Sequence, residues 1–257
     1  MKKIIFTTSW DDGHEMDFKL AEILQKYNMK GTFYVAKKHP RQNLSKGEIA
    51  KLAKTAHEIG AHTLTHPELD KIELQKAIDE IIGSKNYLED TIGKEVKMFC
   101  YPRGKYNKNV KEIVEKNFAG ARITKKFCIT KPQNKYEFGV SLHVYPFPFR
   151  KRNGKNLLWG RQMLSPILAN SSSMLNLRLP SSSWISWNRL AKNLFDYAAH
   201  NGDIFHLYGH SWEIENYGMW EELENFLKYA SQKGDFIPLT NNETLEHFYS
   251  ENTRGQI

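Results

Sequence analysis

The chain has 257 residues, a length that suits one large domain with a sizeable core. Hydrophobic residues make up 40% and aromatic residues 12%, so the composition is that of a globular protein and excludes a disordered one. The formal charge is +8, but acids are interspersed among the lysines and no nucleic-acid motif accompanies them, so we expect no nucleic-acid partner.

The chain shows no pattern of export or membrane insertion. The residues after Lys2 and Lys3 are apolar only as far as Phe6, and no apolar run reaches the length of a membrane span. Two cysteines, Cys100 and Cys128, fit a reducing compartment. We therefore expect a cytoplasmic protein without a transmembrane segment, although the positive charge also suits peripheral contact with an anionic membrane. Nothing in the sequence indicates an oligomeric state.

Strand-like and helix-like stretches alternate along most of the chain. Hydrophobic periodicity predicts strands at residues 3–7, 32–36, 61–63, 96–101, 204–208 and 236–239, and helices at residues 16–27, 46–59, 73–92, 108–117, 187–200, 219–232 and 242–249. Such alternation indicates a parallel sheet or barrel wrapped by helices. Between residues 129 and 180 the alternation stops, and serine triplets and prolines indicate loops. We expect one domain over residues 1–257, with an insertion or substrate-facing segment at residues 129–180.

Two adjacent carboxylates, Asp11 and Asp12, stand at the end of the first predicted strand, directly before Gly13. Neighbouring side chains on a strand point to opposite faces, so the pair can share one task only where the backbone turns, which Gly13 permits. A solvated Asp-Gly turn is the alternative. In α/β barrels the functional residues stand at such strand ends.

A histidine pair, His62 and His66, forms the second cluster. At a spacing of four residues two imidazoles can face one metal, and Pro67 favours a strand that bends into a loop over a helix. Hydrolytic zinc sites commonly bind the ion through two histidines and one carboxylate and leave one coordination position open for water. The pattern predicts one divalent ion, zinc first and cobalt or nickel as alternatives, held by one aspartate of the pair while the other acts as a base.

Several stretches resemble motifs of one known family. They are "SWDDGH" (residues 9–14), "KGTFYV" (30–35), "HEIGAHTLTHPEL" (57–69), "FCYPRGKYN" (99–107) and "GDIFHLYGHSW" (202–212). They resemble the polysaccharide deacetylases, the NodB-homology domain of carbohydrate esterase family 4. The resemblance runs from residue 3 to about residue 248 and is poor at residues 129–180.

The resemblance implies a fold and an activity. The fold would be a distorted (β/α) barrel of about seven parallel strands. The activity would be metal-dependent removal of an N- or O-acyl group, N-acetyl in the first place, from a carbohydrate or glycoconjugate. Carried over from the family pattern, Asp11 is the base, and Asp12, His62 and His66 hold the metal.

The chain departs from the family pattern at two points. The third motif often carries an arginine that orients the base, but Cys100 stands there; Arg122 is our candidate replacement, with a surface arginine as the alternative. The late strand offers two histidines where the general acid is expected. We assign His210, which lies nearer the strand's C-terminal end, and interpret His206 as a deeper core histidine.

Four residues are candidates for binding substrate. Tyr101, Arg103 and Gly104 lie in the third motif, where a backbone N–H would stabilise the oxyanion, and Trp212 would stack on a sugar. For Arg103 the alternative is a solvent-facing side chain, and for Trp212 it is packing within the barrel. We interpret His143 as structural or exposed.

Two other functions remain open from the sequence. One is an intracellular amide or formyl hydrolase that acts on a lipid- or nucleotide-linked aminosugar or on another non-polymeric amide. The other is a carbohydrate-binding barrel without catalysis. The intact set of base, metal ligands and acid argues against the second, because a binding module needs no base beside a metal.

Overall fold

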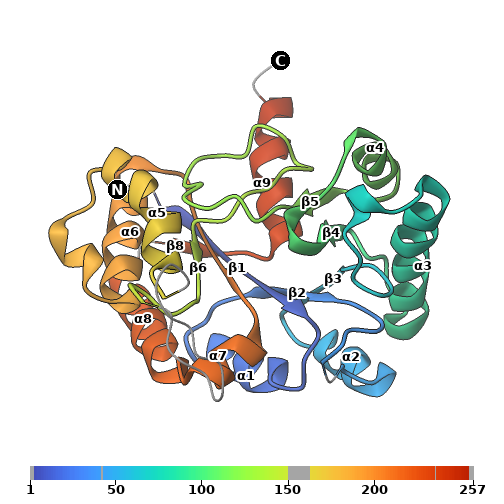
Figure 1. Ribbon diagram of the computed structural model, residues 1–257, viewed down its shortest axis with the longest axis horizontal. Coiled ribbons are helices and arrows are strands. Elements are labelled where there is room, and N and C mark those ends of the chain that lie inside the picture. The colour runs from blue at the N-terminus through green and yellow to red at the C-terminus, as the bar shows by residue number, and fades with distance from the viewer. Residues whose placement is uncertain (1–2, 42, 150–162, 235, 255–257) are drawn as a thin grey trace.

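The computed structural model describes residues 3–41, 43–149, 163–234 and 236–254, which form a parallel sheet surrounded by helices (Figure 1). Seven strands pair in the order β5-β4-β3-β2-β1-β7-β6, and β8 pairs with the beginning of β1. The strands are β1 (Ile4–Asp12), β2 (Gly31–Val35), β3 (Glu58–Ala61), β4 (Met98–Cys100), β5 (Gly120–Arg122), β6 (Leu142–His143), β7 (Ile204–Gly209) and β8 (Phe236–Pro238).

Helices join the strands and pack around the sheet. They are α1 (Asp17–Lys26), α2 (Lys46–Leu52), α3 (Leu74–Ile92), α4 (Lys108–Asn117), α5 (Ser165–Asn176), α6 (Trp187–Asn201), α7 (Ser211–Tyr217), α8 (Trp220–Lys233) and α9 (Asn241–Arg254). In Figure 1, α3 and α4 lie on one side of the strands and α5, α6 and α8 on the other. Short 3-10 turns occur at Leu69–Lys71, Pro102–Gly104 and Ser181–Trp184.

The chain at residues 138–141 links the two ends of the sheet. Phe138 exchanges backbone hydrogen bonds with Ala121 and Ile123 at β5, both of 2.9 Å, and Ser141 donates its N–H to His206 of β7 at 2.8 Å. The sheet therefore curls on itself. The prediction of a distorted (β/α) barrel with about seven parallel strands is confirmed.

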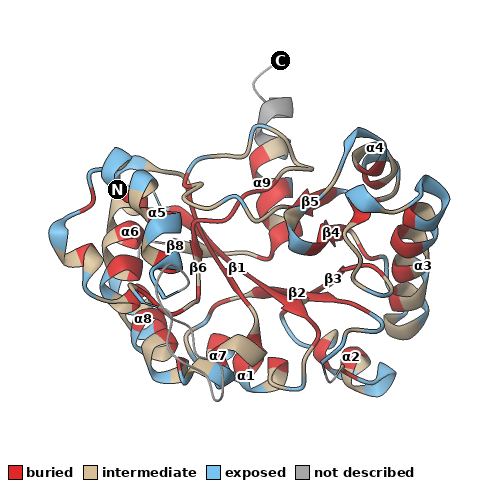
Figure 2. Ribbon diagram, in the orientation of Figure 1, coloured by how far each residue is buried: buried red, intermediate tan, exposed pale blue. Residues whose placement is uncertain are grey.

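Side chains that alternate along β1 belong to two cores. Ile4 and Phe6 pack in the larger core beneath the helices, whereas Ile5 belongs to a smaller core with Leu245 and Phe248 of α9. Figure 2 shows the strands almost wholly buried, with the exposed surface on the outer faces of the helices. Helix α9 covers the end of the barrel near the start of β1. The opposite end, at which the strands finish, is therefore the end that α9 leaves open.

The predicted helix at residues 46–59 is too long, and the predicted strand at residues 61–63 begins too late. Helix α2 ends at Leu52, and β3 starts at Glu58. Between them His57 is buried, with Nδ1 accepting from the Gly31 N–H at 3.1 Å and Nε2 lying 3.2 Å from the Ala21 carbonyl oxygen. These contacts with distant segments outweigh the helical periodicity of the local sequence.

Helical structure also occurs where loops were expected. Helix α7 begins directly after His210, and the first serine triplet, at residues 171–173, lies inside α5. Residues 150–162 of the predicted insertion lie outside the described residues. Among the helices that are described, none is both long and apolar enough to cross a membrane.

Candidate active site

The residues assigned to base, metal and acid meet at the end of the barrel where the strands finish. A cavity of about 330 Å³ opens there. It is lined by Asp11, Asp12, His39, Arg41, His62, His66, Arg103, Thr124, Tyr208, His210 and Trp212. This is the edge at which α/β barrels place functional side chains, because the loops that follow the strands converge on it.

The aspartate pair stands at a sharp turn. Asp11 and Asp12 are the last residues of β1, and both Asp12 (φ 83°) and Gly13 (φ 74°) have left-handed backbone conformations. A Cβ at Gly13 would lie 2.8 Å from Cγ1 of Val35, so only glycine fits this turn. The turn gives both carboxylates access to one cavity, as the sequence predicted.

The histidine pair lies in a strand-to-loop bend, as the proline predicted. His62 follows β3 directly, and His66 has φ 59°. Buried Glu80 of α3 fixes the bend by accepting the N–H groups of Leu64 and Thr65, each at 2.8 Å. The two imidazole rings come to lie 4.7 Å apart between centroids.

Asp12, His62 and His66 form a set of donors that could hold a metal ion, since their ligand atoms all lie within 4.8 Å of one another. Each Nε2 is 3.7 Å from Asp12 Oδ1, which is buried and has no hydrogen-bond partner among the described residues. His62 Nδ1 lies 2.8 Å from the Cys100 carbonyl oxygen, which leaves Nε2 free to ligate. Burial lowers the pKa of His62 to about 4, so its imidazole is neutral, as ligation requires. This donor set therefore fits a divalent cation such as zinc.

Arg122 reaches the base position from the next strand. It donates from Nη2 to Asp11 Oδ1 and is fully buried. Cys100 and Arg122 are direct partners in the β4–β5 register, which explains how an arginine on β5 reaches the place that Cys100 leaves vacant. Burial alone would raise the pKa of Asp11, but Arg122, His62 and His210 outweigh it and lower the pKa to about 2. Asp11 is thus an anion at neutral pH.

His210 faces the other carboxylate oxygen of Asp11, Oδ2, and has its own carboxylate partner. Its Nε2 is 3.9 Å from Asp11 Oδ2, and its Nδ1 is 2.6 Å from Oε2 of Glu213 in α7. Burial lowers the pKa of His210, but Glu213 and the two aspartates raise it to about 9. The imidazolium form, which can donate a proton, is therefore the main form at neutral pH.

His206 lies deeper in the barrel, as expected. It is fully buried, with Nε2 2.9 Å from Ser9 Oγ and Nδ1 2.9 Å from the Gly139 carbonyl oxygen. Burial and Arg122 lower its pKa to about 3. It does not line the cavity around Asp11.

The four substrate-binding candidates separate into two pairs. Arg103 and Trp212 line the cavity, whereas neither Tyr101 nor Gly104 is among its described lining residues. Tyr101 is fully buried and its ring stacks on Tyr106, with centroids 4.5 Å apart. Its side chain is thus part of the core.

Two further residues of the site were missed by sequence analysis. His143, interpreted as structural or exposed, does not line this cavity, and its Nε2 lies 3.2 Å from the same Glu213 oxygen that contacts His210. His39 lines the cavity with Arg41, whose guanidinium lies 3.3 Å from the centroid of the Trp212 ring. The run of His39, Pro40 and Arg41 follows β2, so its position after a strand was the available signal.

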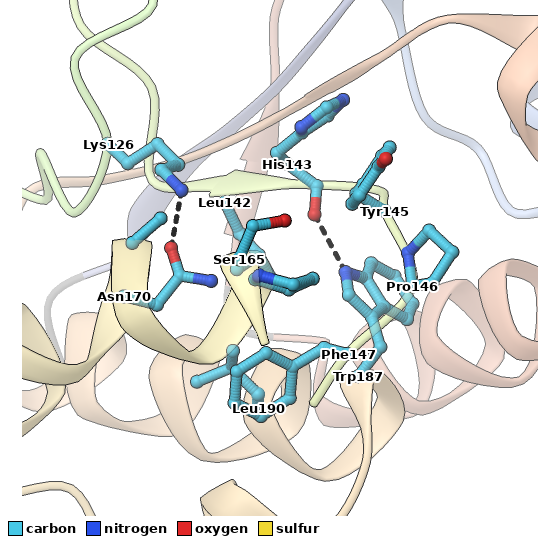
Figure 3. Close-up of a pocket in the computed structure, with 12 residues that line it drawn as sticks. Lys126, Leu142, His143, Tyr145, Pro146, Phe147, Ser165, Asn170, Trp187 and Leu190 are labelled. Atoms are coloured by element: carbon cyan, nitrogen blue, oxygen red, sulfur yellow. Dashed lines mark hydrogen bonds between the residues drawn. The ribbon is translucent and has the colours of Figure 1, made fainter. Parts of the chain in front are cut away.

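A second cavity, of about 240 Å³, lies beside His143 (Figure 3). The His143 carbonyl accepts the Trp187 indole N–H at 2.8 Å, and Figure 3 shows the imidazole pointing away from this cavity. Its described lining residues are mostly apolar and include no carboxylate. The acid-base and metal-ligating groups thus gather in the first cavity.

Comparison with known proteins supports the sequence resemblance. Residues 1–119 match the family model for polysaccharide deacetylase, so the resemblance is confirmed over this part of the chain. A peptidoglycan-N-acetylglucosamine deacetylase of Bacillus cereus is 32% identical over 117 residues, which are 43% of this chain and 40% of that protein. The first curated relatives are matched over only 36 to 40% of their own length.

Solved structures match over nearly the whole chain, at low identity. The Bc1960 peptidoglycan N-acetylglucosamine deacetylase has a TM-score of 0.58 and 17% identity, with 95% of this chain and 89% of that chain covered. A family 4 acetyl xylan esterase from Clostridium thermocellum, solved with a cobalt ion, has a TM-score of 0.57 and 16% identity, with 93% and 89% covered. The chain therefore shares its barrel fold with these two proteins.

Proposed function

We propose that this chain, whose first 119 residues match the polysaccharide deacetylase family, is a metal-dependent hydrolase that removes an acyl group from a carbohydrate. N-acetyl is the first choice among acyl groups. One observation carries the proposal: Asp11 Oδ2 and His210 Nε2 lie 3.9 Å apart beside three residues that could hold a metal ion. A carbohydrate-binding barrel without catalysis would need neither the base nor the acid.

The metal would be held by Asp12, His62 and His66, with zinc preferred for two imidazoles and one carboxylate. When bound, such an ion lowers the pKa of a coordinated water and polarises the acyl carbonyl. The donor set supports this, because Asp12 Oδ1 is buried without a hydrogen-bond partner in the described structure.

Asp11 would accept the proton of the attacking water. Arg122 holds Asp11 in one orientation and keeps it anionic until that proton arrives. His210 would donate a proton from Nε2 to the leaving amine or alkoxide while Glu213 stabilises its cationic form. The base and the acid thus have separate partners, which allows opposite protonation states at one pH.

The oxyanion donor would be the backbone N–H of Arg103. Within the described loop, the Tyr101 N–H donates to the Arg122 carbonyl at 3.3 Å and the Gly104 N–H to the Tyr101 carbonyl at 2.8 Å. Pro102 has no N–H group, so Arg103 supplies the donor that remains. The φ of Arg103 is 56°, a left-handed value that departs from the regular 3-10 conformation.

The test is release of carboxylic acid together with metal content. Zinc-loaded protein should release acetate from an N-acetylglucosamine oligomer, and Asp11→Asn should abolish the release without loss of zinc. Activity only on a small amide, or formate release from a formylated aminosugar, would show that the substrate is non-polymeric. Stoichiometric zinc without hydrolysis of any acylated sugar would overturn the proposal.

A further inference from the structure

A third imidazole faces the carboxylate that we assign to the metal. His39 Nε2 lies 3.7 Å from Asp12 Oδ1, the same distance as the Nε2 atoms of His62 and His66. The His39 ring meets the His66 ring edge-on, with centroids 4.9 Å apart and planes at 86°. One buried oxygen is therefore surrounded by three imidazole nitrogens.

The position of His39 is fixed by the fold. Asn43 Oδ1 accepts the His39 N–H at 2.7 Å, and Asn43 Nδ2 donates to the carbonyl oxygens of Asp12 at 3.3 Å and Ala36 at 3.2 Å. Leu44 adds a 2.9 Å backbone bond to Gly13. The loop after β2 is thereby tied to the Asp12 turn, and the side chain of His39 is only 11% exposed.

The imidazole of His39 has no hydrogen bond among the described residues that would account for its orientation. Its Nδ1 is buried without a partner among the described residues, and 3.7 Å between Nε2 and Asp12 Oδ1 is too long for a hydrogen bond. Nε2, the nitrogen that faces Asp12 Oδ1, is therefore free to take a ligand.

We propose that His39 is an additional metal ligand, which gives this chain a donor set of three histidines and Asp12. The inference rests on the metal of the proposed function, but it concerns binding and not turnover. Ligands at about 2.0–2.2 Å from a tetrahedral zinc ion lie about 3.3–3.6 Å from one another. His62 and His66 already form a set with Asp12 whose donor atoms lie within 4.8 Å of one another, so they need only a small inward movement. His39 matches them in its distance from Asp12 Oδ1 but lies outside that set, so its ligation requires the imidazole to turn toward the ion.

The test measures metal binding by His39→Ala. Zinc affinity, measured by competition with a chromophoric chelator, should fall at least about 10-fold, the lower limit for loss of a metal-supporting residue. In the cobalt-loaded protein the visible absorption bands should shift, and X-ray absorption should count one imidazole fewer. His200→Ala removes an exposed histidine of α6 and should change none of these readouts.

A second variant separates ligation from folding. Asn43→Ala keeps the imidazole but releases its loop, so zinc affinity should fall by less than in His39→Ala. Unchanged zinc affinity and cobalt spectra in a folded His39→Ala protein would overturn the inference. A rise in KM for the sugar in that variant would not rescue it. Wild-type protein that binds no zinc would instead refute the metal of the proposed function.

Discussion

Trp212 donates its indole N–H to Oδ2 of Asp12 at 2.8 Å, across 200 residues of sequence. This bond occupies one oxygen of the carboxylate and directs the other, Oδ1, toward the imidazoles. One face of the Trp212 ring is covered by Arg41. Trp212 thus orients Asp12, and stacking of a sugar on the ring face that Arg41 covers would require Arg41 to move.

Trp212→Phe should lower zinc affinity about 10- to 100-fold, because Asp12 loses the donor that orients it. The phenyl ring keeps an aromatic face, so KM for the carbohydrate should change little. Trp220→Phe is the matched control, since it removes an indole bond to Glu215 away from the cavity. A raised KM at unchanged zinc affinity would show that the indole is a sugar platform.

Asp11→Asn and Asp12→Asn should differ although the residues are adjacent. Asp11→Asn should abolish turnover and keep zinc, because Asp11 bonds to Arg122 and serves as the base. Asp12→Asn should weaken zinc binding itself, because it removes the ligand charge. Zinc stoichiometry in the two purified variants tests this, and equal loss in both would reverse the assignment of the pair.

Arg122→Met should shift the acid limb of the pH profile upward. Without the guanidinium, burial raises the pKa of Asp11, so the base becomes protonated at a higher pH. Removing one member of a buried ion pair should also cost about 3–5 kcal/mol of unfolding free energy. The pH dependence of kcat/KM and urea unfolding check both effects. An acid limb unchanged in a folded variant would mean that Arg122 does not control Asp11.

Glu213→Gln should move the alkaline limb to lower pH. With a pKa of about 9, His210 is protonated below that pH, so activity should fall as the pH rises through about 9. Loss of the carboxylate removes a charged hydrogen bond worth about 1.5–3 kcal/mol, equivalent to roughly 1–2 pH units. Glu215→Gln on the same helix should leave the limb in place, and a limb that stays in Glu213→Gln would contradict the prediction.

His210→Ala should lower kcat roughly 10²- to 10⁴-fold and remove the alkaline limb, with zinc content unchanged. His206→Ala should instead lower thermal stability, because Ser9 and the Gly139 carbonyl lose their partner in the core. A full pH profile and a melting curve for each variant distinguish the two. If the alkaline limb vanished only in His206→Ala, our assignment of the acid would be wrong.

The sequence alone located the elements whose signals are local. The aspartates, the glycine and the strand before them predicted a turn at Asp12, because only certain residues adopt a left-handed backbone. The spacing of His62 and His66 and the proline after them predicted a loop with two imidazoles on one side. Alternating periodicity predicted the parallel barrel, because buried strands and amphipathic helices have different repeats.

Tertiary structure decided which distant groups support these residues. Arg122 was a candidate replacement for the missing motif arginine, but the β4–β5 register is what sets it opposite Cys100 and beside Asp11. Glu213 reaches His210 only because α7 begins where a loop was expected. His39 reaches Asp12 only because Asn43 ties two loops together. Such contacts depend on which strand ends and loops converge at the barrel rim, and that convergence leaves no periodic pattern in the local sequence.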